Sequence, residues 1–244
     1  MSVTSERTQE AFTCLDGRRD APVVLTCEHA SDRLPEPWRW PAEDARLRGT
    51  HWTHDLGAAE LTAELARALD LPAVLSRFTR LLVDPNRGED EAGLFRRVAE
   101  GAPVALNEGL DAAERERRLA AYHRPYHGAV HAMVAESDAQ TVLSMHSFTP
   151  LYEGRARPMH IGVLFNHEEA LAGEVARALV GAGFLVALNE PYSGREGLIY
   201  AAERHAGTHG RRALELEVRQ DLATDPSARR QIVGALARFF AAAG

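Results

Sequence analysis

The segment APVVLTCEHASD, residues 21–32, places a mostly apolar run directly before a cluster of polar side chains. Apolar residues at neighbouring positions of 21–27 are typical of a strand that is buried on both faces. Glu28, His29 and Asp32 follow at the point where this strand would end. The segment therefore favours a sheet that is covered on both sides and carries polar side chains at one edge.

Apolar runs and helical segments alternate along the rest of the chain. Helices separated by strands predict an α/β fold, with a mostly parallel sheet between two layers. Pro125 is expected to interrupt the second helix, because proline lacks the N–H that a helix interior needs. Strands are expected at residues 71–75, 81–84, 141–145, 160–165, 184–188 and 213–218, and helices at 59–69, 111–136, 167–181 and 227–243.

No repeat or long linker divides the sequence of 244 residues. We therefore expect one domain over residues 1–244, with roughly the first 15 residues peripheral. The C-terminal helix carries Phe239 and Phe240. Covering its own sheet is the simpler role for this helix, and packing across a homo-oligomer interface is the alternative.

Composition excludes several classes of protein. The chain has 28 basic and 35 acidic residues, a formal net charge of −7, which argues against a nucleic-acid partner. All basic residues are arginine, so lysine chemistry is excluded. No apolar run approaches the roughly 20 residues of a membrane span, and the polar N-terminus lacks a signal-peptide core. A soluble, cytoplasmic protein without a membrane partner is expected, and its two cysteines, Cys14 and Cys27, form no disulfide framework.

Polar residues follow four of the expected strands. Ligands bind outside the carboxyl ends of parallel strands, so these residues are the candidates for function. Imidazole and carboxylate groups suit zinc, a further carboxylate can act as a base, and arginine matches a substrate carboxylate. The four groups are Glu28, His29 and Asp32; Asp84, Asn86 and Arg87; His146 and Ser147; and Glu217 and Arg219.

Each candidate also has an ordinary structural interpretation. His29 alone could cap the next segment, and Glu217 alone could face solvent from an exposed strand. Asn86 and Arg87 could form a turn with a structural ion pair. The combination favours a metal-dependent hydrolase, because all four groups fall at strand ends.

Seven short motifs occur in a fixed order between residues 21 and 222. The set resembles the N-formylglutamate amidohydrolase family, whose members are similar in fold to zinc carboxypeptidases and aspartoacylases. The resemblance implies a three-layer α/β/α fold with a mixed, mostly parallel central sheet. The motifs are CEHAS, HDLG, VDPNR, YHRPYH, HSFTP, NEPYSG and EVRQDL.

The resemblance also implies roles for individual residues. His29 and His146 would be zinc ligands, and Glu217 would be the catalytic base. Asn86 and Arg87 would bind the substrate carboxylate.

One ligand position departs from the pattern. Carboxypeptidase-like sites use His-x-x-Glu, whereas the spacing here gives His29-x-x-Asp32. Asp32 is preferred as the carboxylate ligand on spacing. Asp55 is a second candidate, and Glu28 is disfavoured because neighbouring side chains point in different directions.

Two further residues are assigned to substrate binding. His127 of YHRPYH would face the pocket as a proton donor or support a ligand, although packing in the core is equally compatible with its position. Tyr192 of NEPYSG would line the pocket, with a plain loop as the alternative. A second acidic group of the substrate could be bound by Arg77, Arg80, Arg195 or Arg219.

The expected function is metal-dependent hydrolysis of a small N-acyl amino acid, specifically N-formyl-L-glutamate to formate and L-glutamate. The cofactor would be Zn²⁺ or another divalent metal. A cysteine-dependent hydrolase using Cys27 beside His29 is one alternative. A non-catalytic protein that binds a small acidic ligand is the other.

Overall fold

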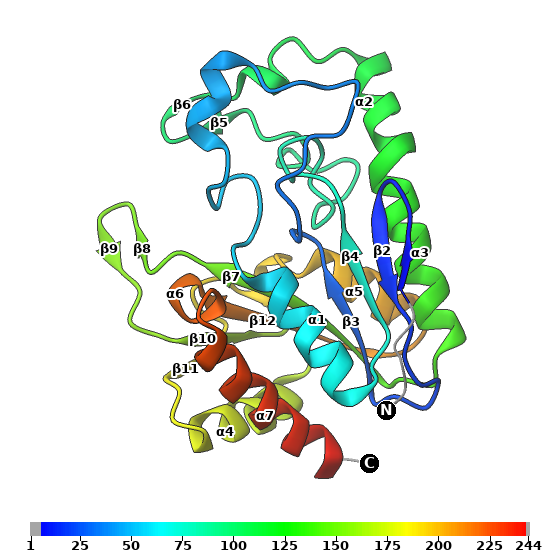
Figure 1. Ribbon diagram of the computed structural model, residues 1–244, viewed down its shortest axis with the longest axis vertical. Coiled ribbons are helices and arrows are strands. Elements are labelled where there is room, and N and C mark those ends of the chain that lie inside the picture. Colours follow the sequence, from blue (N-terminus) through cyan, green and yellow to red (C-terminus); the bar gives the residue numbers. More distant parts are fainter. Residues whose placement is uncertain (1–5, 243–244) are drawn as a thin grey trace.

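The computed structural model describes residues 6–242, which are built around an eight-stranded sheet (Figure 1). The strands lie in the order β1-β2-β4-β3-β7-β12-β10-β11. The neighbours from β4 to β12 are parallel, as are β10 and β11, whereas β1, β2 and β4 and the β10–β12 pair are antiparallel. The strand bounds are β1 (Glu6–Thr8), β2 (Phe12–Leu15), β3 (Val23–Cys27), β4 (Ala73–Ser76), β7 (Thr141–Phe148), β10 (Ile161–Leu164), β11 (Val186–Leu188) and β12 (Arg212–Arg219).

Helices cover both faces of the sheet, as Figure 1 shows. Helices α1 (Ala58–Leu69), α4 (Glu169–Gly181) and α7 (Pro226–Ala242) pack together on one face, and α3 (Arg124–Glu136) and α5 (Tyr200–Thr208) cover the other. The three-layer fold with a mixed, mostly parallel sheet is confirmed. The predicted end of the last helix, residue 243, lies outside the described residues.

Alternation along the central strands separates the two layers. Leu214, Leu216 and Val218 of β12 belong to the core on the α1, α4 and α7 side. Successive strand residues point to opposite faces, so Glu215 and Glu217 point to the other side. Leu143 and Met145 of β7 also belong to the core on the α1, α4 and α7 side, so His146 shares the face of the two glutamates.

The helix expected at 111–136 does not end at Pro125, but its α-helical hydrogen bonding is interrupted just before this residue. Helix α2 (Ala112–Arg118) is followed by a π-helical turn (Leu119–His123), and Pro125 lies in the first turn of α3. Proline is tolerated there because first-turn N–H groups have no partner within the helix. The three pieces therefore run on without a break in direction.

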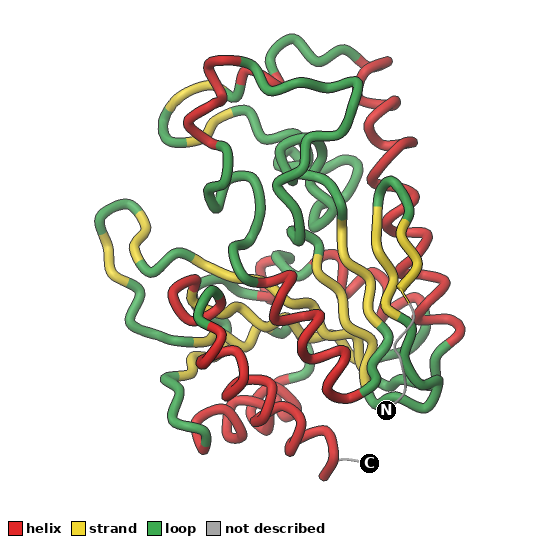
Figure 2. Tube along the Cα trace, viewed as in Figure 1, coloured by secondary structure: helices red, strands yellow, loops and turns green. Residues whose placement is uncertain are grey.

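The expected strand at 81–84 is wrong. These residues form turns within a loop-rich lobe, residues 33–57 and 78–110, which stands above the carboxyl ends of the strands (Figure 2). The backbone N–H of Asp84 donates to the carbonyl of Leu94 within the lobe at 2.9 Å. Leu81 belongs to a separate small core of the lobe, with Leu47 and Val104, whereas Leu82 and Val83 pack in the larger core on the α3 side. The apolar run therefore reflects packing in two cores and not a strand.

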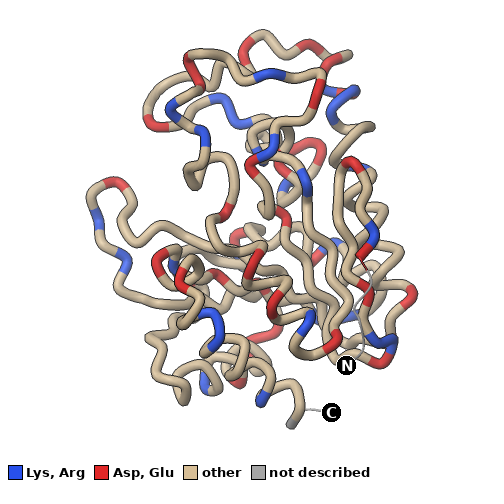
Figure 3. Tube along the Cα trace, viewed as in Figure 1, with Lys and Arg blue, Asp and Glu red and all other residues tan. Residues whose placement is uncertain are grey.

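The first two strands and helix α5 differ from the expected elements. The β1–β2 hairpin lies at one sheet edge, where β2 pairs with β4, and residues 1–5 of the segment expected to be peripheral lie outside the described residues. Helix α5 has no counterpart among the predicted helices. Figure 3 shows arginines and acidic residues interspersed in the lobe and around the sheet. Across residues 6–242, no helix is long and apolar enough to cross a membrane.

Candidate active site

The carboxyl ends of β3 and β7 bring two histidines together. His29 lies two residues beyond the end of β3, and His146 lies near the end of β7, which is parallel to β3. Their Nδ1 atoms are 3.1 Å apart and both side chains are buried. The pairing of the strands thus joins residues that are 117 positions apart in the sequence.

The loop before α1 adds a carboxylate to this pair. Asp55 Oδ2 lies 2.8 Å from Nδ1 of His146 and 3.4 Å from Nδ1 of His29. The backbone N–H of Asp55 donates to the carbonyl of His29 at 2.9 Å, and the N–H of Ser147 donates to Asp55 Oδ2 at 3.3 Å. The loop is therefore fastened to the ends of both strands, and the side chains form a compact His29–Asp55–His146 group.

The outer nitrogen of each ring is hydrogen-bonded to a different carboxylate. Nε2 of His29 donates to Asp84 Oδ1 at 2.7 Å, and Nε2 of His146 donates to Glu28 Oε2 at 2.9 Å. Glu28 also accepts a hydrogen bond from the hydroxyl of Tyr126 at 2.9 Å. Carboxylates in this position fix the tautomer and the orientation of a ligating histidine.

This arrangement fits a cation. Nδ1 of His146 is within hydrogen-bond distance of Asp55 Oδ2, and a proton on this nitrogen is favoured while no cation is bound. Because Nε2 of each ring donates to its own carboxylate, a bound cation can replace that proton and accept the Nδ1 lone pair of both neutral rings. Two imidazoles and one carboxylate are the protein ligand number and type of a catalytic zinc site.

The surrounding charges stabilise the ionised carboxylates. Burial opposes ionisation of Glu28, but hydrogen bonds from His146 and Ser144 lower its pKa to about 2. Burial likewise opposes ionisation of Asp84, and the nearby charge of Arg80 holds its pKa well below the ordinary value. Both carboxylates are therefore charged acceptors at neutral pH.

Arg80 connects the inner and outer carboxylates. Its guanidinium lies 3.5 Å from Asp55 Oδ1 and 2.9 Å from Asp84 Oδ2. Buried charges of this kind are stable only when they are paired and hydrogen-bonded. Arg80 thus holds both carboxylates in place and balances part of their charge.

Two glutamates of β12 complete the acidic side of the site. The parallel register places Glu217 beside His146, and Glu215 Oε2 lies 3.4 Å from His146 Nε2. Burial raises the pKa of Glu215 to about 7 and raises the pKa of Glu217 well above its ordinary value. Glu217 Oε2 is buried without a hydrogen-bond partner among the described residues, so this oxygen is available to a reacting molecule.

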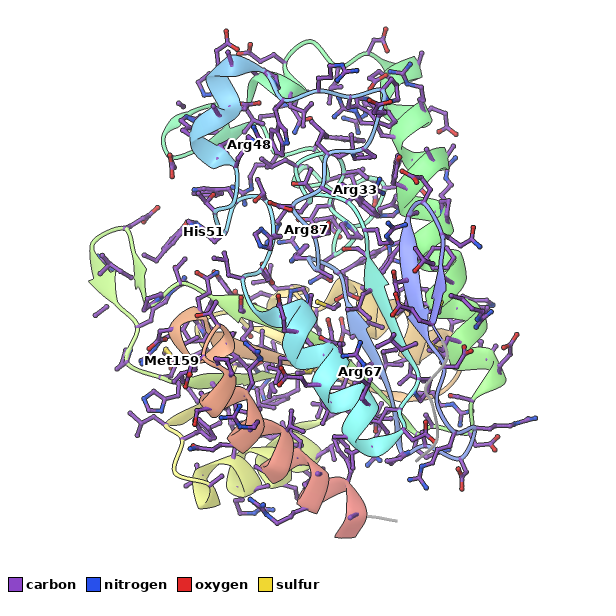
Figure 4. All side chains as sticks on the ribbon, viewed as in Figure 1. Arg33, Arg48, His51, Arg67, Arg87 and Met159 are labelled. Atoms are coloured by element: carbon purple, nitrogen blue, oxygen red, sulfur yellow. The ribbon has the colours of Figure 1, made fainter. Side chains whose placement is uncertain are left out.

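A cavity of about 240 Å³ lies between the sheet edge and the loop-rich lobe, and its floor is formed by the His29–Asp55–His146 group and the two glutamates of β12. Arg87 and Arg96 of the lobe form part of its wall, together with His51, and Tyr192 lines it from the segment after β11. Figure 4 shows Arg87 and His51 on the loops above the strand ends. The cavity therefore combines an acidic, imidazole-rich floor with arginines above it.

A comparison with protein families matches residues 21–224 to the model described as N-formylglutamate amidohydrolase. The chain belongs to this family. It is accordingly a hydrolase that acts on amide C–N bonds. A comparison with curated protein sequences found no match.

Solved structures show the same fold. A gene product of Agrobacterium tumefaciens is 29% identical over 96% of this chain and 95% of its own, with a TM-score of 0.88. An N-formylglutamate amidohydrolase from Ralstonia eutropha is 22% identical over 95% of this chain and 98% of its own, with a TM-score of 0.74. A bacteriophage poly-gamma-glutamate hydrolase is 11% identical over 97% of this chain and 92% of its own, with a TM-score of 0.52.

Of the four residues that the sequence suggested as metal ligands or catalytic base, three lie together at the cavity and one does not. His29, His146 and Glu217 all line the cavity. Asp32, the preferred carboxylate, is exposed and lies outside the His29–Asp55–His146 group. Asp55, the second candidate, occupies the position beside both histidines.

The four substrate-binding candidates differ in their surroundings. Arg87 and Tyr192 line the cavity, and so does Asn86. The amide of Asn86 is already engaged, because Oδ1 accepts from the N–H of Ala201 at 3.0 Å and Nδ2 donates to Glu215 Oε2 at 3.3 Å. His127 is buried between α3 and α5, where its Nδ1 lies 2.9 Å from Nε2 of His205, and it does not line this cavity.

Sequence reasoning gave no role to several residues of the site. Glu215 could have been found, because it stands two positions before Glu217 in an alternating strand and must share its face. Asp84 followed an apolar run, which marked it as a candidate without revealing its partner. Arg96 had no signal, since it lies in a segment without periodicity.

Proposed function

We propose that this protein hydrolyses the amide bond of N-formyl-L-glutamate, or of a closely related N-acyl amino acid, in a reaction that depends on a divalent metal. His29, Asp55 and His146 would hold the ion, and zinc is the metal that this donor set suits best. The observation that carries the proposal is the convergence of two Nδ1 atoms and Asp55 Oδ2 while both Nε2 atoms are bound to carboxylates.

Glu217 is the proposed proton carrier. A divalent ion bound beside it would act as a Lewis acid toward the acyl oxygen and make a water molecule easier to deprotonate. Glu217 would take a proton from the attacking water and return it to the nitrogen of the departing amino acid. Its unpartnered Oε2 and raised pKa suit both steps.

Arg87 is the proposed partner of the substrate α-carboxylate. Its side chain lines the cavity and packs against Gly93, where an added Cβ would lie 3.2 Å from Arg87 Nε. Asn86, whose amide is engaged by α5 and Glu215, would hold the segment rather than provide a free amide. A fixed arginine orients the scissile bond toward the floor of the cavity, and such positioning is a large part of catalysis.

The test measures bound metal and deformylation of N-formyl-L-glutamate in the wild type and in Glu217→Gln. We expect the variant to retain its metal and to lose about 10²- to 10⁴-fold in kcat, because the amide cannot accept the proton. Glu174→Gln, on the exposed side of α4, is the matched control and should behave like the wild type. Full activity of Glu217→Gln would exclude the assigned base, and a protein that neither contains nor responds to divalent metal would exclude the metal proposal.

The cysteine alternative finds little support in the surroundings of Cys27. The thiol is fully buried in the core on the α1 side, and burial raises its pKa, which suppresses the reactive thiolate. Cys27→Ser should therefore retain activity. Binding of formyl amino acids without turnover would instead favour the non-catalytic alternative.

A further inference from the structure

The three arginines that line the cavity differ in their acidic partners. Arg80 is ion-paired with two buried carboxylates. Arg87 has a single, distant partner, with Nε 3.9 Å from Glu91 Oε2. None of the ion pairs formed within residues 6–242 includes Arg96.

The backbone of Arg96 is held in place by hydrogen bonds, although its side chain is only partly buried at the cavity wall. Its carbonyl accepts a hydrogen bond from Asn107 Nδ2 at 2.8 Å, and the same amide nitrogen donates to Leu81 O at 2.9 Å. Asn107 is buried, and its Oδ1 accepts from the buried guanidinium of Arg118 at 2.7 Å. A buried, fully bonded amide of this kind fixes the position from which the Arg96 side chain starts.

The guanidinium of Arg96 is also oriented. It stacks over the ring of Trp52, 5.0 Å from the centroid, and Trp52 lines the same cavity. Nη1 of Arg96 donates one long hydrogen bond to the carbonyl of Val98, at 3.4 Å. Stacking on an aromatic ring leaves the edge of a guanidinium accessible, so its other N–H groups can bind a carboxylate. The guanidinium is therefore positioned to bind an anion at the cavity wall.

Electrostatics point the same way. Burial and the positive charge of Arg80 lower the pKa of Arg96, and Arg87 adds to the effect. The wall of the cavity therefore carries the charge of Arg96, which no ion pair within residues 6–242 neutralises, and that of Arg87, which has only one distant acidic partner. The floor carries the carboxylates. A substrate with anionic groups at the end remote from its amide bond matches this separation of charge.

We propose that Arg96 is a specificity-determining residue that binds a second, side-chain carboxylate of the substrate, while Arg87 binds the α-carboxylate. The cavity then selects N-acyl derivatives of dicarboxylic amino acids over neutral analogues of the same shape. This inference rests on the proposed function, which sets the orientation of the amide bond. Arg96 affects which substrate is bound and takes no part in the chemical step.

The test compares N-formyl-L-glutamate with N-formyl-L-glutamine, which has the same shape without the second charge. In the wild type, kcat/KM should favour the glutamate compound. Arg96→Gln should lower kcat/KM for N-formyl-L-glutamate by about 10- to 100-fold, since a charged hydrogen bond is lost, and change the glutamine compound by less than about twofold. Arg97→Gln, at the neighbouring exposed arginine outside the cavity, is the control and should leave both values unchanged.

A binding measurement separates failure of this inference from failure of the proposed function. L-glutamate should bind the wild type more tightly than L-glutamine, and Arg96→Gln should remove the difference. Equal binding of the two amino acids by the wild type, or a preference that survives Arg96→Gln, overturns the role of Arg96 whether or not hydrolysis is observed. Absence of hydrolysis with the binding preference intact overturns only the proposed reaction.

Discussion

Two buried histidine clusters lie in this molecule, and they have opposite surroundings. In the first, His29 and His146 lie 3.1 Å apart among carboxylates. In the second, Nδ1 of His127 lies 2.9 Å from Nε2 of His205 between α3 and α5, and the ring of His123 packs against that of His127 at a tilt of 57°. The two paired histidines of each cluster are buried and within hydrogen-bond distance of each other, but within residues 6–242 only those of the first cluster are hydrogen-bonded to carboxylates.

The pKa shifts express that difference. Burial opposes protonation of His146, but the charge of Glu215 and hydrogen bonds to Asp55 and Glu28 raise its pKa well above the ordinary value. In the second cluster burial dominates, so the pKa of His127 falls well below its ordinary value. The carboxylates of the first cluster therefore favour positive charge there, whereas the surroundings of the second cluster disfavour it.

The largest expected effect separates the two clusters by their metal content. His146→Ala removes a proposed ligand, so bound metal and hydrolysis should both be lost, with kcat/KM reduced by about 10³-fold or more. His127→Gln should retain metal and most of the activity while lowering the free energy of unfolding by about 1–3 kcal/mol, because a buried hydrogen bond is weakened. Metal analysis, kinetics and urea unfolding of both variants check this.

The comparison breaks if the clusters exchange roles. Loss of metal from His127→Gln with His146→Ala unaffected would place the ion between α3 and α5. Equal loss in both variants would show that the second cluster supports the first.

The next effect distinguishes the two aspartates considered as ligands. Asp55→Asn keeps the shape of the side chain but removes the charge beside both Nδ1 atoms, so metal affinity should fall by at least about 100-fold. Asp32→Asn, on the exposed neighbouring segment, should stay within about twofold of the wild type. Competition with a chelator gives both affinities, and a larger loss in Asp32→Asn would restore the choice made on spacing.

That choice shows where sequence reasoning reached its limit. The strand ends at His29, His146 and Glu217 could be predicted, because apolar runs identify strands and parallel strands bring their carboxyl ends to one edge. Asp55 comes from a loop whose course depends on contacts between distant segments. Local spacing favoured Asp32, but the backbone hydrogen bond from Asp55 to His29 determines which carboxylate comes near.

The fold shows the same limit. Regular elements of the sheet and its covering helices follow from periodicity, so most of them were predicted. Residues 81–84 have the composition of a strand, but they form turns in which Leu81 packs in the small core of the loop-rich lobe and Leu82 and Val83 pack in the core on the α3 side. The roles of Asp84 and Arg96 depend on that lobe and could not be read from the pattern.

A smaller effect is expected at the carboxylate behind His29. Asp84→Asn retains a hydrogen-bond acceptor for Nε2 but loses its charge and the ion pair with Arg80, so metal affinity should fall by about 10- to 100-fold. Asp90→Asn, at an exposed position of the same lobe, is the control. An unchanged metal affinity in Asp84→Asn would show that the charge of Asp84 does not affect metal binding by His29.

The smallest effect concerns the dependence of stability on pH in the second cluster. Burial lowers the pKa of His205 to about 4, whereas the ordinary value is 6.5. Between these values the unfolded chain binds a proton that the folded chain excludes, so stability that is complete above pH 6.5 declines as the pH falls toward 4. His205→Gln keeps a polar partner for His127 without a titrating group, so the free energy of unfolding of the wild type should fall relative to this variant by on the order of 1 kcal/mol per pH unit. Urea unfolding across this pH range measures the difference. Parallel pH profiles for the two proteins would mean that the pKa of His205 is the same in the folded and unfolded chains. The two clusters would then not differ in the way their surroundings shift the pKa of a histidine.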